Sequence, residues 1–243
     1  MDAEKIRQRL ELNEIAYREE LPEKLAVYHA LLRDWNNRMD LTAVSEDNEM
    51  IDRHFIDSLT VLKTGLIPEE AKLIDVGTGA GFPGLVLAMA VPGLEVTLLD
   101  GLQKRLSFIE AVCRETRTDS VTLIHARAED GARKAELREY FDIAVARALA
   151  PANVLCEYLL PYVRIGGLAL CWKGPALLNE LPSGKKAAHL LGGRMEQPVS
   201  CPVFGQEWEH SILPITKMQS TPTCYPRKAG LPKKQPLGEQ KEE

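Results

Sequence analysis

The chain has 243 residues, 45% of them hydrophobic and 27% charged, which is the composition of an ordinary globular protein and excludes wholesale disorder. Its longest apolar runs, such as residues 85–91, are far shorter than the roughly 20 residues of a membrane helix, so no transmembrane span is expected. The N-terminus shows no basic stretch followed by an apolar one, and a cytoplasmic location is therefore expected.

The net charge of −5, taken alone, argues against a nucleic-acid partner, but the charge is unevenly distributed. Residues 1–70 carry 9 basic and 16 acidic side chains, a net charge of −7. Residues 214–243 carry 6 basic and 3 acidic ones, a net charge of +3. The chain therefore has an acidic beginning and a basic end.

The first 65 residues are predicted to be helical. Apolar residues recur at helical spacing from residue 2 to about residue 19, and a second such pattern follows Pro22, which suits the first turn of a helix. A third helix is expected over residues 48–62. We interpret residues 1–65 as a small N-terminal helical cap.

From Lys72 the pattern changes to short apolar runs bounded by turn residues, which predict strands. Five buried strands are expected at residues 73–76, 95–100, 121–124, 142–146 and 168–172. Helices are expected between them at residues 83–90, 104–115, 129–138 and 152–163. This alternation predicts an α/β fold with a doubly wound, mainly parallel sheet.

A further helix over residues 176–191 and two strand-like stretches, residues 195–203 and 209–215, would complete a sheet of seven strands with an antiparallel end. We assign residues 66–216 to this domain. Beyond residue 217 the chain is rich in Pro and Lys, which predicts a basic, extended C-terminal segment over residues 217–243.

A glycine loop follows the first predicted strand, with the sequence DVGTGAGFPG over residues 75–84. Gly77 and Gly79 suit a turn in which the backbone takes positive φ and approaches a ligand closely. Asp100 ends the second strand 23 residues after Gly77, where a carboxylate can accept hydrogen bonds from both ribose hydroxyls of a nucleoside. The loop predicts a nucleoside cofactor, with a tight strand-to-helix turn of no further role as the alternative.

The form of the loop favours S-adenosylmethionine as that cofactor. Dinucleotide folds carry G-x-G-x-x-G, whereas Phe82 here occupies the sixth position and glycine the fifth. The form D-x-G-x-G-x-G is typical of S-adenosylmethionine enzymes, whose ligand has no pyrophosphate for a helix N-terminus to bind. The chain lacks a P-loop and a G-x-S-x-G elbow, which argues against nucleotide hydrolysis and serine esterase chemistry.

No metal site is predicted from the five cysteines. They are widely spaced, form no C-x-x-C pair and have no clustered histidines, so reduced and mostly buried thiols are expected.

Several strings together closely resemble one family, the small-subunit ribosomal RNA methyltransferase G family, also called glucose-inhibited division protein B. The resemblance runs from about Trp35 to Leu237, and a departure is Asp40, where the family usually has Asn. The strings are residues 35–42 (WNNRMDLT), 54–59 (HFIDSL), 75–84, 104–105 (KR), 127–129 (RAE), 147–151 (RALAP), 172–174 (WKG) and 225–228 (YPRK).

The resemblance implies a Rossmann-like class I methyltransferase sheet of seven strands, the last one antiparallel. It implies transfer of a methyl group from S-adenosylmethionine to N7 of one guanine in 16S ribosomal RNA, free or within the small ribosomal subunit. It further implies that Gly77 and Phe82 line the cofactor, that Ala128 and Glu129 flank its adenine end, and that Arg147 closes the site. A monomer is the expected oligomeric state.

Arg147 is the residue expected nearest the reacting atoms, although no catalytic residue is assigned outright. Guanine N7 carries a lone pair and no proton, so the reaction needs positioning rather than a general base. The Asn/Asp-Pro-Pro-aromatic string of many enzymes that methylate exocyclic amines is absent after the fourth strand, which agrees with such a target. The guanidinium could bond the cofactor carboxylate or guanine O6, or merely pair with Glu129 or Asp142.

His54, Asp57 and Ser58 lie at helical spacing, and we expect a structural role or a lid over the cofactor rather than a hydrolytic triad. The candidate RNA contacts are Lys173, at the end of the fifth strand, and Arg227 and Lys228 in the acid-free C-terminal segment.

Two other functions stay open at this point. One is methylation of a small molecule or protein, which the acidic cap favours. The other is a non-enzymatic binding protein connected with cell division.

Overall fold

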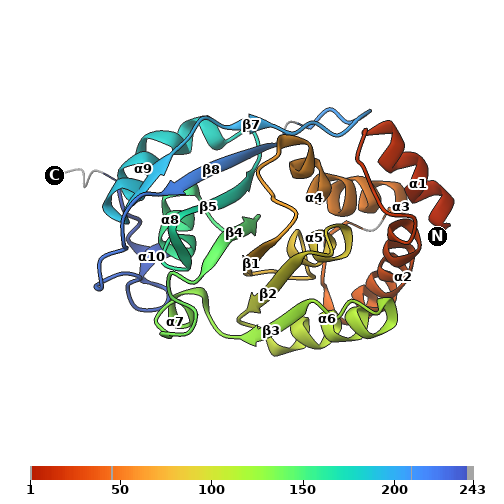
Figure 1. The fold of residues 1–243 in the computed structure, drawn as a ribbon, viewed down its shortest axis with the longest axis horizontal. Helices are drawn as coiled ribbons and strands as arrows, with labels where there is room; N and C mark the ends of the chain where they lie inside the picture. The colour runs from red at the N-terminus through yellow and green to blue at the C-terminus, as the bar shows by residue number, and fades with distance from the viewer. Residues whose placement is uncertain (1, 45, 209, 240–243) are drawn as a thin grey trace.

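The computed structural model describes residues 2–44, 46–208 and 210–239. Its centre is a sheet with the strand order β3-β2-β1-β4-β5-β8-β6, and β7 pairs with β8 beside this path (Figure 1). The strands are β1 (Ala71–Val76), β2 (Leu94–Asp100), β3 (Val121–His125), β4 (Phe141–Arg147), β5 (Val163–Lys173), β6 (Gly193–Met195), β7 (Val199–Ser200) and β8 (Ser211–Lys217).

The predicted doubly wound sheet with an antiparallel final strand is confirmed. Strands β1 to β5 pair in parallel, and β8 pairs antiparallel with β5 and with β6. The stretch expected as one strand over residues 195–203 is instead divided into β6 and β7, because Pro198 between them has no N–H to continue the ladder. Residue 209, expected to begin the last strand, lies outside the described residues, and β8 begins at Ser211.

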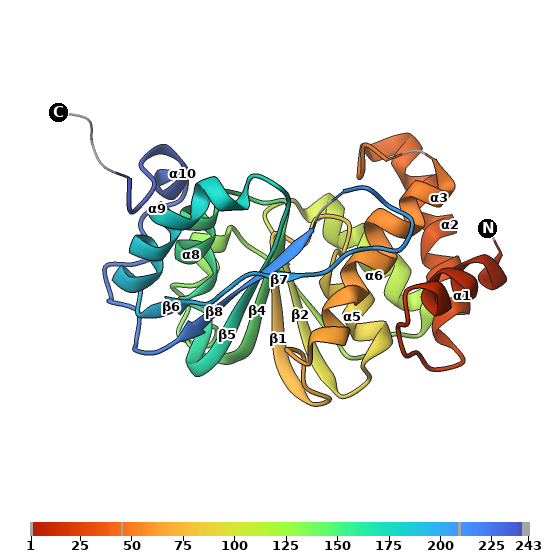
Figure 2. The same ribbon diagram turned by 90° about the horizontal axis from the view of Figure 1, so that it is seen from above.

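Helices cover both faces of the sheet (Figure 2). Helices α5 (Gly84–Ala90) and α6 (Gln103–Thr116) pack on one face, and α8 (Ala152–Leu159) and α9 (Leu177–Leu190) pack on the other. Successive residues of each strand face opposite sides of the sheet. Leu73 therefore belongs to the hydrophobic core under α5 and α6, and Ile74 belongs to the core under α8 and α9. The two cores account for the nearly continuous apolar character of these strands.

The N-terminal region is helical, as expected, with different limits. Its elements are α1 (Ala3–Leu12), α2 (Leu21–Met39), α3 (Asp47–Met50), the π-helix η1 (Ile51–Ile56), α4 (Asp57–Leu59) and the 3-10 helix η2 (Thr60–Thr64). The first helix ends at Leu12 rather than near residue 19, because Glu14 adopts a left-handed φ of 54°. The expected single helix over residues 48–62 is divided among four short helical elements.

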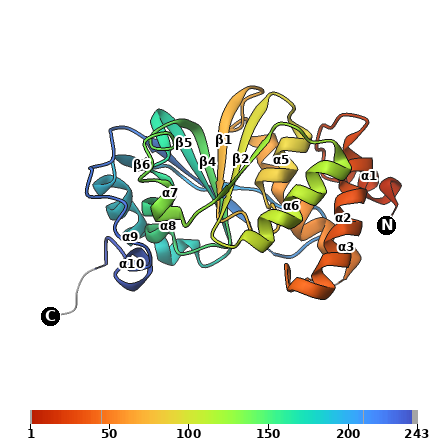
Figure 3. The same ribbon diagram turned by 90° about the horizontal axis from the view of Figure 1, so that it is seen from below.

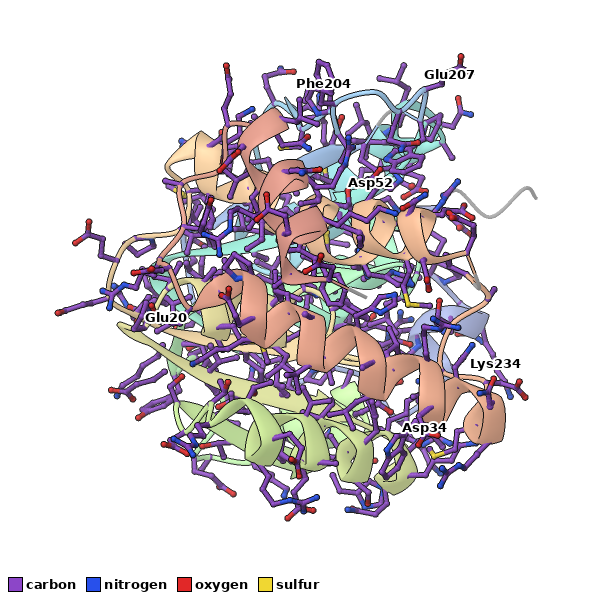
Figure 4. The ribbon with its side chains drawn as sticks, turned by 90° about the vertical axis from the view of Figure 1, so that its right-hand side faces the viewer. Glu20, Asp34, Asp52, Phe204, Glu207 and Lys234 are labelled. Carbon is purple, nitrogen blue, oxygen red and sulfur yellow. The ribbon has the colours of Figure 1, made fainter. Side chains whose placement is uncertain are left out.

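Arg9 of α1 ties this region to the segment before β8. Its Nε donates to Asp52 Oδ1 at 2.7 Å, and its Nη2 donates to the Phe204 carbonyl oxygen at 2.7 Å. Figure 4 labels Asp52 and Phe204, which lie toward the same end of the molecule. Within the described ranges, no helix is long and apolar enough to cross a bilayer.

Two predicted helices are shorter in the structure. The helix expected over residues 152–163 ends at Leu159, because Pro161 breaks it and Val163 already pairs with Phe141 in the sheet. The helix expected over residues 129–138 consists only of α7 (Ala128–Gly131). The turns that follow α7 are held by Arg138, which donates to the Tyr225 carbonyl oxygen at 2.9 Å, a long-range contact that no local pattern indicates.

The C-terminal segment, residues 217–239 of the described chain, is more closely packed than its composition suggests. It contains the short helix α10 (Leu231–Lys234), which contacts α8 (Figure 3). Lys217 is buried and forms an ion pair with Glu139 at 3.0 Å. Pro226 and Pro232 are also buried. The expected extended segment is therefore folded onto the sheet domain.

Candidate functional site

The glycine loop lies at the carboxyl end of β1. Gly77, Gly79 and Gly81 have φ values of 72°, 62° and 99°, a conformation that favours glycine. The amide N–H groups of Gly77 and Thr78 donate to the carbonyl oxygen of Leu99 at 2.8 and 3.1 Å, which turns the loop toward β2. No atom lies within 4 Å of the position that a Gly79 Cβ would occupy, so the backbone there is open to a ligand.

Asp100 is held at the end of β2 by this loop. Its Oδ2 accepts the N–H of Gly79 at 2.9 Å, and its Oδ1 accepts the N–H of Leu102 at 2.9 Å. Arg105 approaches Oδ2 at 3.4 Å. An ionised carboxylate has about four acceptor positions. The two amide N–H groups take two of these positions, so two remain for the hydroxyls of a ribose once the long Arg105 contact is displaced.

A cavity of about 380 Å³ opens beside Asp100 and brings together Gly77, Asp100, Ala128 and Glu129, four of the residues that the sequence analysis proposed for the cofactor. Neither Phe82 nor Arg147 lines it, and Gly79 borders it only through its bond to Asp100. The other lining residues are Leu99, Gly101, Leu102, Arg105, Ala126, Arg127, Leu149, Tyr158 and Lys233. The size and the mixed apolar and polar lining suit a nucleoside.

Phe82 lies behind the glycine loop, between the loop and the N-terminal helices. Its ring stacks on Tyr28 with the centroids 5.2 Å apart and on His54 with the centroids 4.7 Å apart. The Tyr28 hydroxyl donates to the carbonyl oxygen of Ala80. Phe82 and Tyr28 therefore fasten the loop to α2, so that the N-terminal region shapes the site from behind.

Arg147, at the end of β4, is held by the N-terminal region through three of its five N–H donors. Its Nη1 donates to the Arg53 carbonyl oxygen at 2.6 Å and to Asp57 Oδ2 at 3.0 Å, and the guanidinium lies 5.1 Å from the centre of the Phe82 ring. The two alternative partners considered above are wrong. Glu129 accepts a backbone N–H and Asp142 pairs with Arg164 at 2.6 Å, so neither reaches Arg147.

A second cavity, of about 330 Å³, opens beside Arg147 at the ends of β4 and β5. Its lining residues are Val44, Arg53, His54, Asp57, Arg147, Ala148, Trp172, Lys173, Gly174 and His210. Asp57, only 1% exposed, joins two of them, because its Oδ1 lies 2.6 Å from His210 Nδ1 while its Oδ2 accepts from Arg147. Sequence reasoning missed His210, which pairs with Asp57 across 153 positions.

His54 is neutral in this arrangement. Burial and then the charge of Arg147 lower the pKa of His54 to about 3. Its Nδ1 faces the donor Nη2 of Arg147 at 3.3 Å, so the ring proton is assigned to Nε2, which lies 2.7 Å from Thr42 Oγ1. Ser58 donates to the backbone carbonyl of His54 rather than to its ring. His54, Asp57 and Ser58 therefore form no nucleophilic triad.

Two of the three proposed RNA contacts are engaged in ion pairs. Lys173 lies 2.5 Å from Glu180 and its side chain is only 9% exposed. Arg227 lies 2.7 Å from Glu157, which is almost fully buried. Lys228 is exposed, as are Lys233 and Lys234 in α10. Ion pairing thus leaves fewer exposed basic side chains than the sequence suggests.

The buried carboxyl of Asp75 makes the stability of the fold depend on pH. Burial raises the pKa of Asp75 to about 6, although Oδ2 accepts from Thr78 Oγ1 at 2.7 Å and from the N–H of Gly84 at 2.8 Å. Oδ1 has no partner among the described residues. Because the folded pKa lies above the unfolded value of 3.8, the stabilisation is complete below that value and is lost as the pH rises through 6.

The variant Asp75→Asn cannot ionise and should lack this pH dependence. We expect the free energy of unfolding of the wild type, relative to the variant, to fall between pH 4 and pH 7. Urea unfolding at several pH values measures the difference. Parallel pH profiles for the two proteins would contradict the assignment.

Among the described residues no group of three or more His, Cys, Asp and Glu side chains could hold a metal ion.

Comparison with protein families finds one match over most of the chain. The sequence model of a family described as rRNA small subunit methyltransferase G matches residues 21–210. A protein of that name from Alkaliphilus oremlandii is 47% identical over 214 residues, which cover 88% of this chain and 90% of the relative. The one from Clostridium perfringens (strain SM101) is 43% identical over 228 residues, covering 94% and 93%.

Solved structures share the fold at low sequence identity. A TehB-like SAM-dependent methyltransferase from Corynebacterium glutamicum superposes with a TM-score of 0.50 at 16% identity, covering 79% of this chain and 98% of that one. TYW2 of M. jannaschii, solved in complex with AdoMet, gives a TM-score of 0.51 at 13% identity, covering 67% and 77%.

Proposed function

The chain belongs to the rRNA small subunit methyltransferase G family, and from this we propose that it transfers the methyl group of S-adenosylmethionine to N7 of one guanine in 16S ribosomal RNA. The observation that carries the proposal is the family match over residues 21–210, which includes the glycine loop, Asp100 and Arg147. The adjacent cavities at the carboxyl ends of the strands support it, since ligands bind there in open α/β sheets.

The residues around the first cavity fit S-adenosylmethionine. Gly77 lines the cavity and Gly79 presents open backbone beside it. Asp100 offers acceptor positions for the ribose hydroxyls, and Ala128 and Glu129 border the end proposed for adenine. Bound there, the cofactor supplies a methyl group on a sulfonium sulfur. We assign Phe82 a supporting contact behind the loop rather than a place in the cavity wall.

We assign the second cavity to the target guanine. Arg147 and Trp172 border it, and it opens at the ends of β4 and β5. The loop after β4 joins the two cavities, because Ala148 lines the second and Leu149 lines the first. The guanidinium of Arg147 is held by Asp57 and Arg53, so it can donate to guanine O6 without a further change in position.

The chain needs to orient the base rather than remove a proton. Guanine N7 attacks with a lone pair, so no general base is required. The neutral ring of His54 is therefore not proposed as a general base. Correct alignment in a site that excludes water can supply several kcal/mol of the rate enhancement. Arg147 is therefore proposed as the principal catalytic residue.

One experiment separates this function from the alternatives. The purified protein is incubated with labelled S-adenosylmethionine and 16S ribosomal RNA, either free or in the small subunit, and the labelled nucleotide is mapped. Label on N7 of a single guanine is expected. Label only on protein or small molecules would support the other methyltransferase function, and failure to bind the cofactor would support a binding protein. The two RNA preparations show which form is the substrate.

The exposed lysines Lys228 and Lys234 are proposed to contact RNA phosphates, with Lys173 and Arg227 holding the surrounding structure. Each phosphate contact releases counterions, so replacing one lysine by alanine should reduce the slope of log affinity against log salt by about 1. Filter binding of 16S ribosomal RNA at several salt concentrations measures this slope. Lys5→Ala, at an exposed site in the acidic N-terminal region, is the control. Slopes equal to the wild type would contradict the assignment.

The proposed organisation keeps the three parts of the sequence analysis: the helical cap of residues 1–65, the methyltransferase domain of residues 66–216 and the C-terminal segment. We also propose that the protein acts as a monomer, and in the cytoplasm, where its proposed substrate is found.

A further inference from the structure

Helix α10 of the C-terminal segment reaches the proposed cofactor cavity. Lys233 lines that cavity, although it lies more than 100 positions after Asp100 and Glu129, which line it too. Its neighbour Lys234 does not line it and lies at the periphery of the molecule in Figure 4. The segment thus presents one lysine to the cavity and one to solvent.

Buried carboxylates hold the segment in this position. Glu157 of α8, with its side chain only 1% exposed, accepts from Arg227 Nε at 3.0 Å, from Nη2 at 2.7 Å and from the backbone N–H of Arg227 at 2.7 Å. Such a paired, charge-assisted contact is directional as well as strong. The middle of the segment is therefore fixed against α8.

A second contact joins the segment to the cavity wall itself. Glu129 Oε1 accepts the backbone N–H of Gly230 at 2.7 Å, and Glu129 also lines the cavity. Arg133 donates to the Pro226 carbonyl oxygen at 2.7 Å from the turn after α7. Because Gly230 immediately precedes α10, these bonds determine where Lys233 lies relative to Glu129.

The ammonium of Lys233 is available for a ligand. Lys233 is exposed. Within residues 2–44, 46–208 and 210–239, its side chain forms no ion pair and no hydrogen bond. In contrast, Arg227 and Lys217 of the same segment are paired with Glu157 and Glu139. An ammonium group can only donate, and the adenine ring offers acceptor nitrogens.

We infer that the C-terminal segment forms one wall of the cofactor site and that Lys233 is a binding residue, donating to a ring nitrogen at the adenine end of S-adenosylmethionine. The inference depends on the proposed function only for the identity of the cofactor. It gives the segment a role in cofactor binding that is separate from its proposed contacts with RNA.

The test is calorimetric binding of S-adenosylmethionine in the absence of RNA. Lys233→Met removes the ammonium and keeps most of the aliphatic stem, and Lys234→Met is its matched control. Because both lysines are exposed, neither change should affect folding, which thermal unfolding checks. We expect Lys233→Met to weaken binding about tenfold, as for loss of one hydrogen bond from a charged group, and Lys234→Met to change it less than twofold.

A second ligand, 5′-methylthioadenosine, lacks the amino-acid part of the cofactor. If Lys233 contacts adenine, Lys233→Met should weaken binding of this ligand by the same factor as binding of S-adenosylmethionine. Equal affinities of wild type and Lys233→Met, an equal loss in Lys234→Met, or a loss seen only with S-adenosylmethionine would each overturn the inference. If the wild type itself fails to bind S-adenosylmethionine, the proposed function fails instead.

Discussion

Replacing Arg147 by alanine should lower the rate of methyl transfer at least about 100-fold, the cost typical of removing one donor aimed at the reacting group. Three chain contacts hold the guanidinium, with the Arg53 carbonyl, Asp57 and His54, and the side chain is only 13% exposed. Single-turnover methylation of 16S ribosomal RNA measures the loss. Cofactor binding should change much less, because Arg147 does not line the first cavity.

A control must separate the chemical role of Arg147 from its structural one. Arg147→Ala leaves the buried carboxylate of Asp57 with the His210 imidazole as its remaining side-chain partner, so some loss of stability is expected. Combining it with Asp57→Asn removes the buried charge and should recover part of that stability without restoring methylation. If the double variant regains wild-type activity, Arg147 serves only to neutralise Asp57 and the assignment fails. Near-normal methylation by Arg147→Ala alone would have the same meaning.

Replacing Asp100 by alanine should weaken binding of S-adenosylmethionine about 100-fold, since two hydrogen bonds to a charged group are lost together. The substitution removes the acceptor proposed for the ribose and also the partner of the Gly79 N–H, which holds the loop. Titration calorimetry measures the affinity, and Asp100→Asn should give an intermediate value because it keeps one acceptor oxygen.

The matched control for Asp100 is Asp130→Ala, which removes an exposed carboxylate in α7 that does not line the cavity. Its affinity for S-adenosylmethionine should stay within about twofold of the wild type, as for most surface substitutions. Equal affinities of Asp100→Ala and Asp130→Ala would exclude Asp100 from the cofactor site.

The parts of the site that depend on local sequence could be predicted closely. The glycine loop, the acid ending β2 and the residues after β3 each follow a strand, and parallel strands deliver their ends to one edge of the sheet. Gly77, Asp100, Ala128 and Glu129 accordingly line one cavity. The predicted helix limits differ from those of the structure where long-range contacts decide them, as in the turns after α7 that Arg138 holds.

The N-terminal helices illustrate the limit of the same reasoning. Their apolar spacing predicts helices, but Tyr28 and Phe55 gather around Phe82 only because α2 and η1 pack over the glycine loop. The apolar spacing of a helix indicates which of its faces is buried, but it does not indicate which element covers that face. The support that these helices provide to the loop is therefore a tertiary property.

The sequence by itself determined the class of fold, the cofactor loop and the family, because strand and helix periodicity and the glycine spacing act over short distances along the chain. Only the tertiary structure decided which charges are available. Arg147 pairs with Asp57 across 90 positions and Arg227 with Glu157 across 70, and charge counting along the chain cannot detect such pairs. Ion pairs with glutamates engage Lys173 and Arg227. The basic side chains that stay exposed near them are Lys228, Lys233 and Lys234.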